Sequence, residues 1–322
     1  MLRLARSARR NRPQGSNIGR IRQGFYRLLW LGVLTSTTLA QKPTQPASEE
    51  HLALIARASE HERVALESPK PYRYQERLDW NWGSETRSVI ETAEGRADRI
   101  VLFNAEPLSP EQQAKQQHRL EKLLSDRDAV KNELKDQKSE TQRRIKIVKA
   151  FPKAFFFDFA GTEKGLLRFN FRPDPDFSPK DRETQMYRGM EGSVWIEPAQ
   201  ERIVRIEGRL VKDVSFGWGI VGHLNKGGIY EISQTQVAPE KWRITKLDVD
   251  LKGKMFLFNS FRFQRKETNS RFQPISPEMT FQEAVNELIV SPARERPGKH
   301  APPKQNQHDH HQTSPQSFPA ER

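Results

Sequence analysis

Residues 192–211 decide the fold, and they read Gly-Ser-Val-Trp-Ile-Glu-Pro-Ala-Gln-Glu-Arg-Ile-Val-Arg-Ile-Glu-Gly-Arg-Leu-Val. Two alternating runs flank Pro198–Glu201, which has the composition of a turn. In the second run Val204, Ile206 and Leu210 face one way, while the charged residues between them face the other. The pattern predicts an antiparallel hairpin with one face on a core and the other in water.

The same alternation extends outward from this hairpin. Before it, Phe155, Phe157 and Phe159 share one face, and the apolar residues of 167–171 alternate with polar ones. After it, we predict strands over 228–237, 242–251 and 255–265, with the last two joined at Lys252-Gly253-Lys254. Nearer the N-terminus, residues 72–80, 87–92 and 99–103 have strand character, with a turn at Glu94-Gly95. Together these runs predict an antiparallel meander.

Three helices are expected beside the strands. Ser48 can cap a helix to about Leu66, and Thr280-Phe281-Gln282-Glu283 is a capping box that opens a final helix to about Ile289. Ser109-Pro110-Glu111-Gln112 opens a helix that can run to about Lys149 on a sparse apolar stripe. The predicted fold class is α+β: a strongly curved antiparallel sheet, or open half-barrel, with helices against its concave side and one long helix, about 110–149, inserted between strands.

The two ends of the chain are expected to lie outside this domain, which we place at 48–290. Residues 1–40 contain eight arginines and no acid, then an apolar run from Leu28 and small residues to Ala40. These are the features of a secretory signal peptide, so we predict cleavage after Ala40, export to the bacterial periplasm or cell envelope, and no stable membrane span afterwards. Residues 41–47 form a polar leader, and the polar tail 291–322 is predicted to be disordered.

Composition excludes several function classes. The chain has no cysteine, so disulfides, thiolate metal sites and cysteine nucleophiles are excluded. Its net charge of +13 falls to +5 once the eight arginines of residues 1–40 are set aside, which argues against nucleic-acid binding. No motif of a known hydrolase or phosphate-binding loop occurs, so we predict no enzymatic activity, no catalytic residue and no cofactor.

The remaining motifs each have a simple structural interpretation. Gly217-Trp218-Gly219-Ile220-Val221-Gly222 matches a dinucleotide-binding pattern but lacks the strand–helix context, so we interpret it as a hairpin loop whose Trp218 forms a flap. The tail histidines His308, His310 and His311 are candidate metal ligands in a solvated segment. The pairs Asp248/Asp250 and Asp174/Asp176, together with His223, are interpreted as structural or solvated groups rather than as acid–base machinery.

A resemblance rests on the hairpin Val194-Trp195-Ile196-Glu197 … Arg202-Ile203-Val204-Arg205-Ile206-Glu207, preceded by a short helix and a curved meander. This arrangement resembles the periplasmic lipoprotein carriers of the LolA type, and the resemblance covers about residues 48–265. It implies a half-barrel that encloses an apolar cavity for acyl chains. The long helix after Ser109 departs from that pattern, and no counterpart of the carriers' latching arginine is identifiable.

The chain contains eighteen phenylalanines and six tryptophans, and this aromatic content has two interpretations. These side chains form either an ordinary packed core or the lining of a cavity for a lipid or an acylated protein. Three functions follow: a lipid-binding envelope protein, an envelope interaction module that docks a protein partner through the 110–149 helix, and, third, an envelope hydrolase. For the first, the expected cavity lining is Phe155, Phe157, Phe159, Phe169, Phe171, Val194, Ile196, Val204, Ile206, Met255, Leu257, Phe261 and Phe263.

Overall fold

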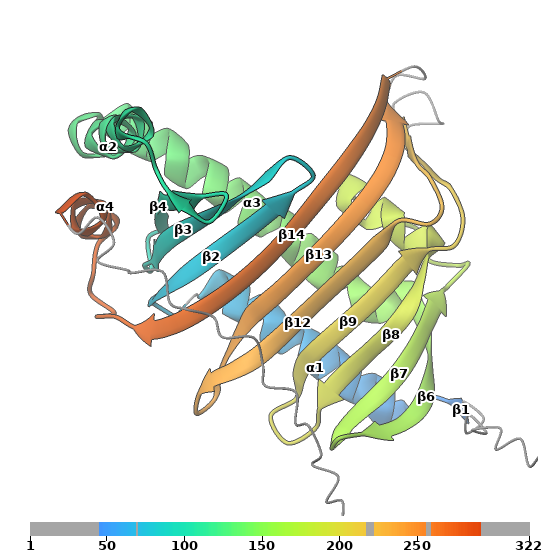
Figure 1. The fold of residues 1–322 in the computed structure, drawn as a ribbon. Coiled ribbons are helices and arrows are strands. Elements are labelled where there is room, and N and C mark those ends of the chain that lie inside the picture. Colours follow the sequence, from blue (N-terminus) through green and yellow to red (C-terminus); the bar gives the residue numbers. More distant parts are fainter. Residues whose placement is uncertain (1–44, 69, 217–221, 256–258, 291–322) are drawn as a thin grey trace, which may run out of the picture. The chain divides into compact units, whose positions relative to one another are not determined.

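One antiparallel sheet organises the part of the chain that the computed structural model describes, which is residues 45–68, 70–216, 222–255 and 259–290 (Figure 1). Within these residues fourteen strands follow the order β1-β6-β7-β8-β9-β12-β13-β14-β2-β3-β4-β5, with β10 and β11 attached beside β13. The path has two ends, so the sheet is not closed. The predicted α+β class, an open antiparallel sheet with helices, is confirmed.

The strands of this sheet are β1 (Gln45–Pro46), β2 (Tyr72–Trp80), β3 (Gly83–Glu91), β4 (Arg96–Phe103), β5 (Glu106–Pro107), β6 (Phe155–Glu163), β7 (Leu166–Pro173), β8 (Met190–Glu197), β9 (Arg202–Leu210), β10 (Val214–Phe216), β11 (Gly222–Leu224), β12 (Ile229–Ala238), β13 (Lys241–Met255) and β14 (Asn259–Pro274). The helices are α1 (Glu49–Glu67), α2 (Pro110–Ser125), α3 (Arg127–Ala154), the 3₁₀ helix η1 (Arg182–Gly189) and α4 (Phe281–Val290).

The order of the strands explains why two long helices cross the sheet. The chain leaves β1 at one edge, crosses on α1 to β2, forms β3–β5 at the other edge, and returns on α3 to β6 beside β1 (Figure 1). From β4 to β6 there are nine strand-to-strand steps, or about 43 Å at about 4.8 Å each. The 28 residues of α3 span about 42 Å. The length of α3 therefore matches the width of sheet that it crosses.

The single helix predicted over 110–149 is wrong, because the chain breaks at Asp126. The start at Ser109 and its capping box are confirmed, but α2 ends at Ser125. Asp126 has extended backbone and its side chain accepts hydrogen bonds from the amides of Asp128 and Ala129, at 2.9 and 3.1 Å. Since a carboxylate in this position satisfies the free amides of a helix start, a second helix begins there.

Two hydrophobic cores hold the helices on the sheet. The first lies under α1 and the end of α3, where Ile55, Phe151 and Phe169 are buried with their neighbours from β6 to β9. The second lies on the other face of the sheet, where Ile90 and Ala97 of β3 and β4 contact α2 and α4. The first turns of α3 pack against this second core, so α3 links the two (Figure 1).

Two local predictions are corrected by the strand register. The expected turn at Lys252–Lys254 lies inside β13, where a Cβ on Gly253 would come within 2.2 Å of the His223 carbonyl oxygen. Gly253 is therefore required for the close approach of β11, not for a turn. In β9, a bulge leaves Val204 without a register partner, so Ile203 takes the core position expected for Val204.

Candidate functional site

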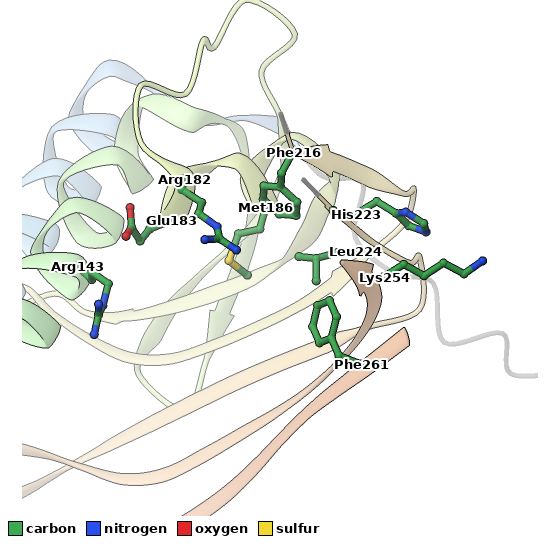
Figure 2. A pocket seen from close by; sticks show the side chains of 10 residues that line it. Arg143, Arg182, Glu183, Met186, Phe216, His223, Leu224, Lys254 and Phe261 are labelled. Carbon is green, nitrogen blue, oxygen red and sulfur yellow. The ribbon is translucent and has the colours of Figure 1, made fainter. Parts of the chain in front are cut away.

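A pocket of about 370 Å³ lies where α3, η1 and the strands β10, β11, β13 and β14 meet (Figure 2). Each of these elements contributes one to three residues to its lining. The lining comprises Arg143, Arg182, Glu183, Met186, Phe216, Gly222, His223, Leu224, Lys254 and Phe261. Its volume falls in the range of sites that bind small molecules.

The floor of this pocket is apolar and continues the first core. Met186, Phe216 and Phe261 are partly buried and pack against that core, and Leu224 is buried in it. Phe261 and Phe263 lie on the same face of β14, opposite Gly253 and Leu251 of β13. Phe263 is 50% exposed, so an uncovered aromatic ring continues the apolar surface beside the pocket.

The basic side chains of the pocket fall into two groups. Arg143 and Arg182 extend from α3 and η1 on one side, and Arg182 points toward the Met186 side of the pocket (Figure 2). His223 and Lys254 form a register pair between β11 and β13, and their side chains point away from Leu224 and Phe261 (Figure 2). The two arginines are therefore the cations that a bound molecule would meet.

These two arginines differ in their partners. Arg143 donates to Glu140 at 2.8 Å, within α3. Arg182 has no ion pair with any residue that the structure describes. The only carboxylate of the lining, Glu183, points away from Leu224 (Figure 2). The pKa of the exposed Lys146 is raised by its hydrogen bond with Asp181 and, to a smaller extent, by the charge of Glu183.

Most side chains predicted to line a cavity lie instead within the first core. Those of β6, β7 and β8 pack against α1 and α3, with Phe169, Val194 and Ile196 fully buried, and the same core contains Phe155, Phe157, Phe159, Phe171 and Ile206. Of the predicted lining, Phe261 borders the pocket and Phe263 lies beside it. Val204 belongs to neither group. Leu257 and the side chain of Met255 lie outside the described residues.

A charged network occupies the other half of the helix-covered face. Glu76 of β2 is fully buried and accepts from Arg96 at 2.6 Å, and its second oxygen has no hydrogen-bond partner. Arg87 lies 3.8 Å from the same carboxylate, and Arg265 lies 4.0 Å from it. Arg265 also pairs with Glu267 at 2.6 Å. Every cation here is matched by a carboxylate, which is the arrangement that buried charges require.

The pKa values of two glutamates in this region are shifted in opposite directions. Burial opposes ionisation of Glu267, but Arg265 and the amide of Asn269 outweigh it, so the pKa of Glu267 lies below its ordinary value. Burial raises the pKa of Glu91, and the more distant charges of Arg243 and Arg96 only partly offset that effect. Both shifts thus follow from how far burial is offset by paired charges.

In each acidic pair identified from the sequence, one carboxylate has a local partner. Asp248 and Asp250 share a face of β13, and Asp250 accepts from Arg262 at 2.7 Å, a hydrogen bond that lowers the pKa of this exposed carboxyl. Asp174 accepts from the amide of Asp176 at 2.8 Å in a turn. In the described part of the chain, no group of three or more His, Asp or Glu side chains could hold a metal ion. Trp218, the other residues of 217–221, His308, His310 and His311 lie outside the described residues.

Sequence reasoning missed the arginines of the pocket and the charged network. Arg143 and Arg182 carry no local signal, because their meeting depends on how α3 and η1 pack. For the network a signal was present: Tyr72, Tyr74, Glu76 and Leu78 share one face of an alternating strand. A carboxylate on an otherwise apolar face indicates a buried partner.

Comparison with protein-family models, with curated proteins and with solved structures finds no match for this chain. None of the helices within the described residues is both long enough and apolar enough to cross a membrane. The geometry of the pocket and of the charged network is therefore the basis on which a function can be assigned.

Proposed function

We propose that the chain is an exported cell-envelope protein that binds a lipid or an acylated protein, as the resemblance to lipoprotein carriers implies, and that it is not an enzyme. The observation that carries the proposal is the pocket with an apolar floor of Met186, Phe216, Leu224 and Phe261. Its floor continues into Phe263, an aromatic ring left half-exposed.

Acyl chains suit this surface for a simple energetic reason. Each methylene moved from water to an apolar site contributes about 0.8 kcal/mol. The thioether side chain of Met186 also adapts to a flexible acyl chain, because methionine has several rotatable bonds. The proposal places the chain against Phe261 and Phe263, rather than among the packed phenylalanines of β6 and β7.

The alternative, docking of a protein partner through the 110–149 segment, has weaker support. The apolar residues of α2 and α3 are used within the fold: Leu120 and Leu123 contact α4, and Ile145 and Phe151 are buried. Apart from Leu124, which is 38% exposed, the exposed side chains of these helices are mostly charged or polar, and such side chains favour solvation over stable docking.

Native mass spectrometry of the protein recovered from a bacterial periplasm tests the proposal. We expect an adduct that is released as a fatty acid, a phospholipid or an acylated peptide. Phe261→Glu should remove the adduct, because it places a charge in the floor of the pocket. Ile229→Glu is the matched control, since Ile229 is a 46% exposed side chain on the opposite face of the sheet. A bare protein mass, with no uptake of Nile red, would contradict the proposal.

A further inference from the structure

The pocket combines an apolar floor with guanidinium groups on one side. We infer that the bound molecule is an amphiphile with an anionic head group, held by Arg182 and Arg143, and an acyl chain on the floor formed by Leu224 and Phe261. This inference rests on the proposed function and specifies the chemical class of its ligand. A carboxylate and a phosphate monoester share the required chemistry.

Arg182 is the stronger anchor of the two. It lies at the pocket, has no ion pair among the described residues, and its exposed side chain reaches toward Met186 of the floor (Figure 2). A guanidinium presents two parallel N–H donors that match the two oxygens of a carboxylate or phosphate. An anion at this position gains these donors without first displacing a protein carboxylate.

Arg143 can serve as a second donor group. Its guanidinium pairs with Glu140 within α3, where both side chains are about half-exposed at 49% and 50%. An exposed pair of this kind contributes little to stability, so the guanidinium can be shared with a ligand at small cost. Glu183 is the carboxylate of the lining, and it is directed away from the floor (Figure 2). The side of the pocket that faces a head group is therefore cationic.

Neutral and cationic head groups fit this arrangement less well. A hydroxyl makes weaker hydrogen bonds to a guanidinium than an ionised oxygen does. A quaternary ammonium would be repelled by both arginines, and the aromatic rings of the floor lie under the acyl chain instead of forming a cage around a cation. The predicted order of affinity is thus anion, then neutral, then cation.

Displacement of Nile red from the full chain tests this order with four ligands of one chain length: decanoate, decyl phosphate, decanol and decyltrimethylammonium, each below its micelle concentration. We expect decanoate or decyl phosphate to bind roughly tenfold more tightly than decanol. Whichever anion binds more tightly identifies the head group as a fatty-acid carboxylate or a lipid phosphate. Arg182→Gln should remove most of the difference between the anions and decanol, while the decanol affinity stays within about twofold.

Lys254→Gln is the matched control, because it removes the same charge from a residue of the lining whose ammonium points away from the floor (Figure 2). The control should leave the preference for anions in place. Equal binding of decanol and both anions would overturn the inference while leaving the proposed function intact, and so would an equal effect of the Arg182 and Lys254 variants. If none of the four ligands displaces Nile red, or Nile red does not bind, the proposed function fails and the inference fails with it.

Discussion

Glu76 is the residue on which the charged network depends. Its carboxylate is fully buried, pairs with Arg96 at 2.6 Å, and lies within 4.0 Å of Arg87 and Arg265. Glu76→Ala would leave these guanidinium groups short of one buried counter-charge, and Arg96 would lose its carboxylate partner. We expect the free energy of unfolding to fall by about 3–5 kcal/mol, as measured in urea denaturation, because an unpaired buried charge is costly.

A neighbour on the same strand provides the control for Glu76. Asp79 pairs with Arg77 at 2.7 Å on the opposite face of β2, where both side chains are partly exposed. Asp79→Ala should therefore cost less than about 1 kcal/mol. Equal losses for the two variants would mean that Glu76 is solvated and that the network is not buried.

Glu91 makes stability depend on pH in a direction opposite to that of an ordinary paired carboxylate. Burial raises its pKa in the folded chain, so the folded state holds the proton more tightly than the unfolded state. The stability that the protonated Glu91 carboxyl contributes is fully present below the unfolded pKa, about 4.3. It is lost as the pH rises through the pKa of the folded state. Glu91→Gln mimics the protonated form, so its stability relative to the parent should increase between pH 4 and pH 7.

Urea denaturation at several pH values measures this difference for Glu91→Gln. The exposed Glu278 supplies the control, because Glu278→Gln removes the same charge from solvent. The control should give a difference that is nearly constant with pH. A constant difference for Glu91→Gln as well would show that Glu91 titrates alike in the folded and unfolded chains.

At the scale of elements, the pairing of β11 with β13 requires a glycine at position 253. A Cβ on Gly253 would meet the His223 carbonyl oxygen at 2.2 Å and the ring of Phe261 at 2.9 Å. We expect Gly253→Ala to separate β11 from β13, to destabilise the protein by about 1–3 kcal/mol and to weaken Nile red binding, because Leu224 and Phe261 both border the pocket. Lys252→Ala, an exposed neighbour on the same strand, should change neither property.

Elements whose signals are local could be predicted from the sequence. Ser48, Ser109 and Thr280 form side-chain caps at the positions expected of them, and β2 has the predicted bounds. The break at Asp126 was missed because the apolar spacing continues across it, and an aspartate alone does not distinguish a cap from an exposed helical residue. The turn expected at Gly253 was wrong because close approach of another strand selects glycine as strongly as a turn does.

The candidate site was less predictable than the fold, since it depends on which helix covers which strand. The alternation of Phe155, Phe157 and Phe169 identified an apolar face correctly. Whether that face borders a cavity or a helix is decided by α1 and α3, which cross the sheet only because β2 and β6 lie far from the preceding strands. Strand order is a long-range property that alternation within one strand does not contain.

For the whole molecule, this crossing divides the helix-covered face into three regions. Under α1 and the end of α3 the face is packed, and from β2 to β4 it is charged. Between these regions, β14 carries Phe261 and Phe263 followed by Arg265 and Glu267 on the same face. The face therefore changes from apolar to charged along one strand, which limits how far a bound chain can extend.

This limit predicts how affinity depends on chain length. For a series of primary alcohols, each methylene that enters the pocket should tighten binding about fourfold, the equivalent of about 0.8 kcal/mol. The gain should stop once the chain passes Phe263, because the next inward side chain, Arg265, is charged and paired with Glu267. Arg265→Leu together with Glu267→Leu should extend the gain to longer alcohols if the pair sets the limit. A gain that stops at the same length in the double variant would place the boundary within the 370 Å³ pocket itself.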